Sequence, residues 1–507
     1  MNENRARRTP VVDVSKESAK QGVFPELGIA GAILGTILGF ATIPEDTTPA
    51  DSLRLSALLM SGCFALAPLR AALSHPRNVL RTENIIGLAP IYWLLLDLIQ
   101  GVSSYEDASR PAISTTFLLV GTFTTMYWIG CLGSPPKLPK TFVQSANIRF
   151  PTSVLFTILV ILFTLGMLRY ALPCGFNPIL MIEALGMPRF ATPWSGSRFG
   201  GVSAILDHLS YFGYLLPALT VMLARRIGWM KGAVWVGIVF SLIFLAFVAQ
   251  GGGRRIIGVM LGAALCFWLL DQKTIKIRHL LVAAACGVLI LFVMQVMLVI
   301  RESGFSKIGA DAIVAAIPGW GDDTVTTGSG TDSFIRVDDN FNRLAMITDI
   351  VPEEHPYVHH QFVFYTLVRP IPRFLWPGKP EDGGFDLATY LHADATLSSS
   401  IIGELYISFG WITVALGGWI FGRFATMPSQ LLDSPQGTVA PMLYGWITMT
   451  LLVGMRSMVE VILFSYALLA WMLIAIGIQW LRQPPTPPKR SLRSAPNGRQ
   501  LPSRPSR

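Results

Sequence analysis

Runs of apolar residues, most of them about 20 residues long, recur along this chain and limit what it can fold into. A helix of about 20 residues crosses the roughly 30 Å of hydrocarbon in a bilayer. Apolar residues make up 52% of the chain and charged residues only 14%, which excludes a soluble globular protein. The sequence therefore predicts an all-α polytopic membrane protein. Its twelve predicted spans, of which the eighth is the shortest, are 24–44, 53–74, 83–101, 112–132, 152–173, 200–224, 231–250, 255–270, 279–300, 398–424, 437–455 and 458–481.

Lysine and arginine residues alternate between the short loops that join these spans. The loops within 70–81, 137–149, 225–231 and 273–278 are basic, whereas the loop 41–52 has acidic residues and no lysine or arginine. Because positive loops stay on the cytoplasmic side, this alternation predicts that both termini are cytoplasmic. The net charge of +9 therefore indicates orientation in a membrane, and nucleic-acid binding is not expected.

This orientation divides the chain into five parts. They are a basic cytoplasmic tail (1–23), spans one to nine (24–300), a large extracytoplasmic loop between spans nine and ten (301–397), spans ten to twelve (398–481), and a basic, proline-rich cytoplasmic tail that we expect to be disordered (482–507). The five cysteines show no CxxC spacing, so neither a disulfide framework nor a metal site is predicted. We expect a reaction that uses no metal and no other cofactor.

A glycine-rich segment with two arginines follows the seventh span, at an outer end where positive charge is unexpected. This segment is Gly251–Arg255. Gly252 and Gly253 let backbone N–H groups approach a ligand, and the guanidinium groups of Arg254 and Arg255 can each bind two phosphate oxygens. The segment therefore indicates a site for a diphosphate. The alternative is that these arginines reach lipid headgroups or pair with carboxylates of the outer loop.

A proline-rich cationic segment, residues 369–380, lies in the long outer loop. Four prolines and a glycine among its twelve residues exclude a regular helix, and aromatic residues lie between its cations. Such a surface suits an anionic or sugar-bearing ligand, and Trp376 could either stack on a sugar or pack against the helix ends. Beyond Gly251–Arg255, the outer cations are Arg301, Arg369, Arg373, Lys379 and Arg456, and we predict that the first four also contact substrate.

Glu404 lies within the outer turns of the tenth predicted span. A carboxylate at the edge of the hydrocarbon is costly, and such residues often mark a site. Glu404 either acts as a general base on a sugar hydroxyl or pairs with an outer arginine such as Arg254 or Arg255. The sequence leaves both alternatives open. His360, in the loop, is a weaker candidate for the base.

Two segments resemble a known family. The run PRFLWPGKP and, about 20 residues later, the run SSSIIGELYISFGW are similar to O-antigen polymerases and oligosaccharide repeat unit polymerases of the Wzy type. Those proteins also tend to carry a glycine-rich outer helix end with arginine, matched here by Gly251–Arg255, and their layout of many spans with one large outer loop covers most of this chain. The resemblance implies a membrane glycosyltransferase that polymerises polyprenyl-diphosphate-linked repeat units into surface polysaccharide at the outer face of the inner membrane.

The resemblance also implies partners and roles. The partners are lipid-linked donor and acceptor glycans and membrane lipid, together with a flippase and a chain-length regulator. A hydroxyl of the acceptor attacks the donor sugar, and polyprenyl diphosphate leaves. Cations are needed on the leaving diphosphate, for which Arg254, Arg255 and Arg373 are the first candidates. A base is needed on the attacking hydroxyl, and Glu404 is the first candidate.

Two other functions fit the sequence. An O-antigen ligase would use the same donor and transfer the glycan to lipid A core, so only the acceptor separates it from a polymerase. A glycolipid flippase or other transporter would also suit twelve spans with both ends inside. Transporters built of two six-span halves usually place their long linker midway and inside. Here the long loop is predicted outside, between spans nine and ten.

Overall fold

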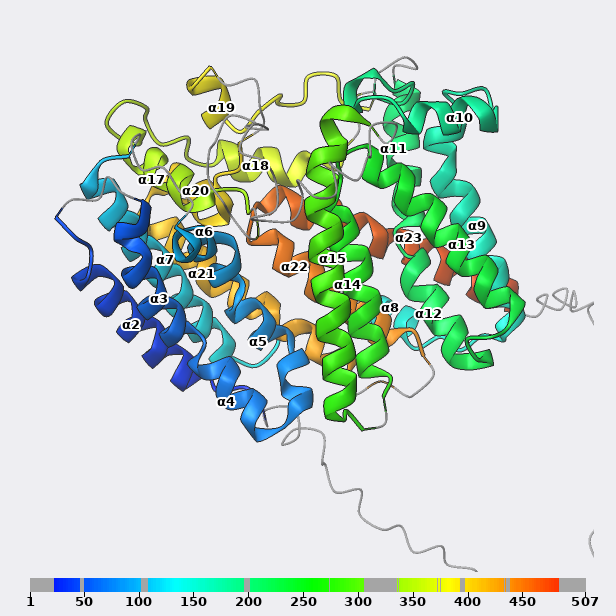
Figure 1. Ribbon diagram of the computed structural model, residues 1–507, viewed down its shortest axis with the longest axis horizontal. Helices are drawn as coiled ribbons and strands as arrows, with labels where there is room; N and C mark the ends of the chain where they lie inside the picture. Colours follow the sequence, from blue (N-terminus) through cyan, green and yellow to red (C-terminus); the bar gives the residue numbers. More distant parts are fainter. Residues whose placement is uncertain are drawn as a thin grey trace, which may run out of the picture.

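The computed structural model describes residues 22–45, 50–101, 108–195, 201–272, 274–304, 335, 337–371, 373, 375–392, 397–432, 434 and 438–482. Within these ranges the chain forms helices and no strand, which confirms the predicted all-α class. Figure 1 shows two groups of helices side by side, with α22 (Ala440–Gly454) between them. Apart from residues 22, 23 and 482, the two basic tails lie outside the described ranges.

The first group of helices gathers around α7. Its members are α2 (Pro25–Ala41), α3 (Arg54–Phe64), α4 (Leu66–Ser74), α5 (Thr82–Gly87), α6 (Leu96–Gln100), α7 (Arg110–Leu132) and α21 (Trp411–Thr426), with the π-helical turn η3 (Ile91–Leu95) between α5 and α6. Glycines let α21 approach α7 closely, since a Cβ added to Gly418 would lie 2.6 Å from the carbonyl oxygen of Phe123. Small residues commonly permit such close packing between helices in membranes.

The second group contains most of the central part of the chain. Its members are α9 (Thr152–Ala171), α11 (Gly201–Gly213), α12 (Leu216–Ile227), α13 (Gly232–Gln250), α14 (Arg254–Leu270), α15 (Ile277–Ser303) and α23 (Met458–Arg482). α14 packs against α12 and α15 within the group and against α22 between the groups. Only 6% of the apolar stretch Ile277–Met297 in α15 is buried, so this helix leaves a long apolar surface open on the side of the bundle.

Six helices among the described residues are long and apolar enough to cross a membrane. They are Thr82–Gln100, Arg110–Leu132, Thr152–Ala171, Gly232–Gln250, Ile277–Met297 and Met458–Leu481. α3 and α4, bent by 40° relative to each other, would make a seventh span if they cross together. The predicted span 398–424 is broken at Gly410, whose φ of +66° favours glycine, into α20 (Ser400–Phe409) and α21. The structure supports a helical membrane protein, and the count of twelve stays a prediction.

The described parts of the long loop fold against one end of the two groups, which we call the outer end after the predicted orientation. They form α17 (Asn340–Ile350), α18 (Gln361–Val368) and the short helix α19 (Leu387–Tyr390). Phe341 of α17 is buried, and its ring centroid lies 4.9 Å from that of Phe117 in α7. Figure 1 places these helices along the same edge as α10 (Pro178–Leu185). The described parts of the loop 301–397 and helix α10 therefore share one end of the molecule.

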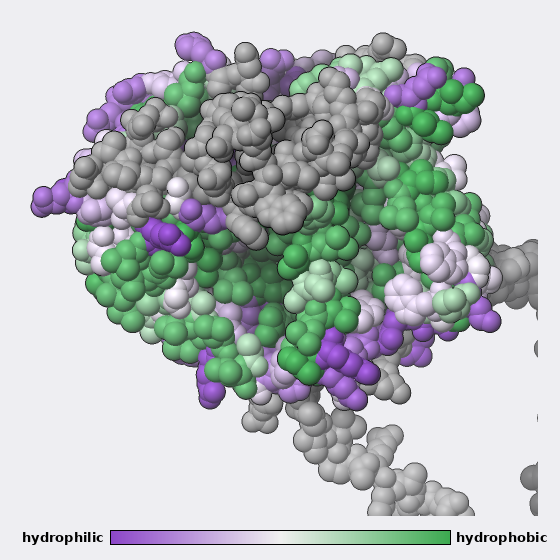
Figure 2. Space-filling model, viewed as in Figure 1, coloured by the Kyte–Doolittle hydropathy of each residue, from purple (hydrophilic) through white to green (hydrophobic). Residues whose placement is uncertain are grey.

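Apolar side chains cover the middle of the face drawn in Figure 2, and polar side chains lie mainly above and below them. Exposed apolar residues include Ile37, Leu242 and Leu281, which are 58%, 60% and 64% exposed. Apolar surface of this extent is typical of a protein embedded in a membrane. The same view shows the apolar surface hollowed between α15 and the first group.

Candidate functional site

The glycine segment forms the turn between α13 and α14. α13 ends at Gln250 and α14 begins at Arg254. Gly252 has a φ of +71°, a conformation that other residues rarely adopt, and a Cβ on Gly253 would lie 2.9 Å from the side chain of Ile256. The glycines thus allow a tight reversal of the chain. This reversal places Arg254 and Arg255 in the first turn of α14, at the outer end of the bundle.

Arg254 forms an ion pair with Asp338, just before α17. Arg456, in the turn before α23, pairs with the other oxygen of the same carboxylate. Asp338 therefore joins two guanidinium groups from segments far apart in the sequence. All three side chains are largely buried, with 12% to 18% of each exposed. This arrangement matches the alternative in which Arg254 pairs with a carboxylate of the outer loop.

Arg255 forms an ion pair with Glu460 in the first turn of α23. Arg456, one helical turn before Glu460, lies 3.3 Å from the same carboxylate oxygen. We call Arg254, Arg255, Arg456, Asp338 and Glu460 the arginine cluster. Within these five residues three guanidinium groups face two carboxylates, an excess of one positive charge. Asp97, Asp339 and Arg343 lie close by and add two negative charges and one positive charge to the surroundings. A cluster with excess guanidinium groups can bind an anion such as a phosphate.

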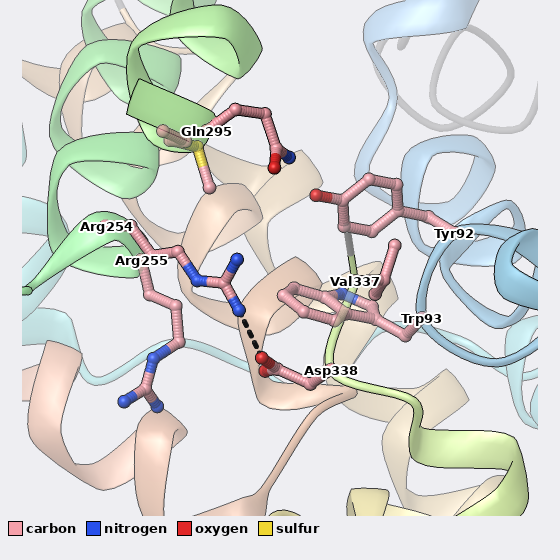
Figure 3. A pocket seen from close by; sticks show the side chains of 8 residues that line it. Tyr92, Trp93, Arg254, Arg255, Gln295, Val337 and Asp338 are labelled. Carbon is pink, nitrogen blue, oxygen red and sulfur yellow. Dashed lines mark hydrogen bonds and ion pairs between the residues drawn. The ribbon is translucent and has the colours of Figure 1, made fainter. Parts of the chain in front are cut away.

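A small recess borders the arginine cluster (Figure 3). It is open to solvent and has room for about one water molecule. Figure 3 shows Tyr92 and Trp93 of η3 on one side and the arginines with Gln295 of α15 on the other, with the Arg254 guanidinium pointing at Asp338. The recess thus lies between the two helix groups. Its lining residues are Tyr92, Trp93, Arg254, Arg255, Met294, Gln295, Val337 and Asp338.

The charges around Asp338 control its ionisation. Burial on its own raises the pKa of this carboxyl, but the positive charges of Arg456 and Arg254 outweigh burial and hold the pKa well below its usual range. The Asp338 carboxyl is therefore ionised at neutral pH. A group whose folded-state pKa is lowered stabilises the fold at every pH above its unfolded-state pKa.

This shift predicts how stability depends on pH. We expect the melting temperature of the wild type to exceed that of Asp338→Asn by a constant margin between pH 8 and about pH 5. The margin should shrink below about pH 4, the pKa of an unfolded aspartate, because the unfolded wild type then binds a proton that the folded protein does not. Thermal unfolding of both proteins across this pH range tests the prediction. A margin that stays constant down to pH 3 would show that Asp338 has an ordinary pKa.

Glu404 is hydrogen-bonded to the start of α23. Its buried carboxylate accepts a hydrogen bond from the Ser457 hydroxyl and another, of 2.6 Å, from the backbone N–H of Met458. Arg254 and Arg255 pair with other carboxylates. The sequence had suggested that Glu404 is a general base or pairs with an arginine such as Arg254 or Arg255. It did not predict these hydrogen bonds to the start of α23. A carboxylate at a helix N-terminus satisfies backbone N–H groups that have no partner within the helix.

The same contacts position Arg456. The N-terminal part of α20 is bonded to the turn before α23, since the Ser398 hydroxyl donates to the carbonyl oxygen of Arg456 at 2.9 Å. The N–H of Ile401 donates to the carbonyl oxygen of Met455 at 3.1 Å. Together with the bonds of Glu404, these contacts fix the backbone on both sides of Arg456. These contacts give Glu404 a position from which it holds the backbone beside the arginine cluster, and its predicted role as a general base stays a prediction.

Two cations of segment 369–380 hold the segment together. Arg373 donates to the carbonyl oxygens of Lys379 and Pro380, both at 3.2 Å, and lies 3.6 Å from the exposed carboxylate of Glu381. Lys379 is buried and donates to the carbonyl oxygens of Arg369 and Ile371 at 2.7 and 2.9 Å. Burial and the charges of Arg369 and Arg373 lower the pKa of Lys379. These contacts give the segment its shape, and the predicted contacts of Arg373 and Lys379 with substrate stay predictions.

The other predicted site residues differ in their surroundings. Arg369 lies over the ring of Tyr365, with its guanidinium carbon 5.3 Å from the ring centroid, and donates to the Tyr365 hydroxyl. Trp376 is 36% exposed and meets Phe364 edge-on, with ring centroids 6.2 Å apart. Arg301 belongs to α15, but its side chain lies outside the described part of the structure. The arginine cluster therefore contains two of the predicted site residues, Arg254 and Arg255.

The sequence did not identify Asp338 or Glu460 as members of this site. Glu460 left a local signal, because it follows Arg456 by four residues, the spacing at which side chains meet on a helix. Asp338 left no comparable signal, since its partners lie 84 and 118 residues away. No group of three or more histidine, cysteine, aspartate or glutamate residues within the described ranges could hold a metal ion.

No model of a known protein family, no curated protein and no solved structure matches this chain. A function can therefore be argued only from its own residues and their arrangement. The most informative arrangement is the arginine cluster, which places three guanidinium groups beside a recess at one end of an apolar helical bundle.

Proposed function

We propose that this chain polymerises polyprenyl-diphosphate-linked oligosaccharide repeat units into surface polysaccharide at the outer face of the inner membrane. The observation that carries the proposal is the gathering of three guanidinium groups in the arginine cluster, at the end of an apolar bundle. Buried charge at such a place is costly and often marks a site for a charged ligand. A diphosphate attached to a lipid combines the negative charge that suits the cluster with the apolar chain that suits the bundle.

The proposed chemistry is glycosyl transfer. A hydroxyl oxygen of the acceptor forms a bond to the anomeric carbon of the donor sugar. The bond from that carbon to the diphosphate oxygen breaks, and the diphosphate leaves with the electron pair. Arg254, Arg255 and Arg456 stabilise the negative charge that grows on this leaving group. The hydroxyl proton passes to a base. Glu404 stays a candidate for this base, since each of its oxygens has a second lone pair beside the hydrogen bond that it accepts.

The apolar surface beside the recess supports a lipid-linked substrate. The recess lies between η3 of the first group and α14 and α15 of the second. Below the outer end, the surface between α15 and the first group is apolar and hollowed (Figure 2). On α15, Leu281 and Leu289 are 64% and 60% exposed. A polyprenyl chain lying along this apolar surface would bring its diphosphate to the recess.

The polysaccharide made by a deletion strain tests the proposed reaction. A polymerase predicts loss of long chains while single lipid-linked repeat units remain at the outer face. Polymer that forms but stays on its lipid carrier would favour a ligase, which shares the donor chemistry. Repeat units retained at the inner face would favour a flippase. Either of these results would contradict the proposed polymerase.

The proposed topology has twelve spans with both termini inside, and labelling of single cysteines tests its orientation. In a variant without the five native cysteines, a cysteine at Gly378 should react with an impermeant maleimide in intact cells, because this residue is exposed at the outer end. A cysteine at Ser74, exposed at the end of α4, should react only after the membrane is opened. A Cβ at Gly378 meets no atom closer than 3.9 Å, so the change is tolerated. The reverse pattern of labelling would invert the topology.

A further inference from the structure

Asp338 occupies the arginine cluster in the way that a phosphate group would. Its two carboxylate oxygens bind two guanidinium groups, one from Arg254 and one from Arg456. Two oxygens of a phosphate could form the same contacts. We propose that Asp338 fills the anion site while no ligand is bound, and that a diphosphate enters by exchange with this carboxylate. The inference rests on the proposed function, which supplies the diphosphate.

The two carboxylates of the arginine cluster, those of Glu460 and Asp338, differ in how easily they can move away from the arginines. Glu460 belongs to α23 and lies one helical turn from Arg456, so its position is set by the helix. Asp338 lies in residues 337–339, which are not helical, and its side chain can turn away without breaking a helix. Asp338 is therefore the carboxylate that a ligand can replace at the lower cost.

The backbone around Asp338 is anchored on the side of the recess opposite the arginines. Ile335 exchanges two hydrogen bonds with the side chain of Gln100, at 2.8 and 3.0 Å. The N–H of Asp339 donates to the carboxylate of Asp97 at 3.1 Å. These partners belong to the Thr82–Gln100 helix of the first group, whereas the carboxylate of Asp338 reaches α14 and the turn before α23. Asp338 thus ties the two helix groups together across the recess.

Replacement of Asp338 by a ligand would therefore couple ligand binding to the contact between the two helix groups. When a diphosphate binds the guanidinium groups, the residues around Asp338 keep their hydrogen bonds to the first group. Asp338 loses its ion pairs to the second group. A ligand shifts such an equilibrium only as far as it binds the open state better than the closed one. A free carboxylate ligand offers the guanidinium groups no more negative charge than Asp338 does. A diphosphate offers them more charge and more acceptor oxygens. The exchange thus makes the site selective for multiply charged anions.

Binding of inorganic pyrophosphate to the purified protein in lipid nanodiscs tests the inference. Asp338→Asn keeps the shape of the side chain and removes its charge, so pyrophosphate should bind on the order of tenfold more tightly than to the wild type. Asp338→Glu keeps a competing carboxylate and should show no gain. Asp349→Asn is the matched control, because Asp349 also lies in the outer loop but accepts hydrogen bonds from Ser109. This control should bind pyrophosphate as the wild type does.

A second measurement needs no variant. Pyrophosphate should increase amide hydrogen exchange at Asp338 of the wild type, while the amides of Ile335 and Asp339 keep their hydrogen bonds to Gln100 and Asp97. Tight binding to the wild type without a gain in Asp338→Asn, or with unchanged or slower exchange at Asp338, would overturn the inference and leave the proposed function standing. Absence of pyrophosphate binding in every protein would overturn the anion site itself, and with it both proposals.

Discussion

Replacing Arg254 by alanine should reduce polymer formation per folded molecule by about 10²–10³-fold, the usual effect of removing one electrostatic donor from a transition state. Arg254 directs its guanidinium into the recess toward Asp338 (Figure 3). On the leaving diphosphate it would act most when negative charge is greatest, so kcat should fall more than the affinity for the donor. Arg255→Ala should behave similarly, because Arg255 lies in the same turn of α14.

A matched control is available at the opposite end of the same helix. Arg225 pairs with Asp271, the residue that follows the end of α14, at 2.6 Å, and both side chains are about one-third exposed. Arg225→Ala therefore breaks an ion pair at α14 without touching the arginine cluster, and polymer formation should stay near the wild-type level. Polymer formation would be measured in membranes and divided by the amount of folded protein. Normal specific activity in both Arg254→Ala and Arg255→Ala would show that the arginines serve only to pair with carboxylates.

The fold class followed from the sequence because each helix leaves its own local signal. The apolar runs are long, and a membrane-spanning helix must be continuous and apolar over its length. Breaks inside a run leave a weaker signal. Gly410 interrupts the predicted tenth span through a φ of +66°, but a glycine within an apolar run is equally compatible with an unbroken helix. The number of spans was therefore harder to predict than their existence.

The site was predictable only where its residues are unusual in their local sequence. Arg254 and Arg255 attracted notice because two cations follow three glycines at the predicted outer end of a span. Asp338 lies in an acidic loop, where one more aspartate does not stand out, and only the fold shows that it reaches α14 and the turn before α23. Lys379 attracted notice as a cation of the proline-rich segment, but the sequence did not show that its ammonium group donates to two carbonyl oxygens of its own loop. Its contact with substrate stays a prediction.

The last prediction concerns Glu404, whose replacement should act mainly through stability. Glu404→Ala removes the acceptor from two buried donors, the Ser457 hydroxyl and the Met458 N–H. Each unsatisfied donor costs about 1–3 kcal/mol, so the melting temperature and the yield of folded protein should fall strongly. Ser457→Ala removes only one of the two hydrogen bonds and should cost less. The loss would also loosen the backbone beside Arg456, so we expect a further, smaller decrease in activity.

Glu404→Gln separates a positioning role from a chemical one. The amide keeps the size of the side chain, and its NH₂ group can donate to the Ser457 hydroxyl oxygen while its carbonyl oxygen accepts from the Met458 N–H. We expect a melting temperature between those of the wild type and Glu404→Ala, and a specific activity within about tenfold of the wild type, because a positioned cation tolerates small shifts better than proton transfer tolerates the loss of its base. Melting curves and polymer formation per folded molecule would be measured on the same preparation. A fully stable, inactive Glu404→Gln protein that still binds the donor would instead make this carboxylate the general base, with the hydrogen bonds to Ser457 and Met458 serving to orient it.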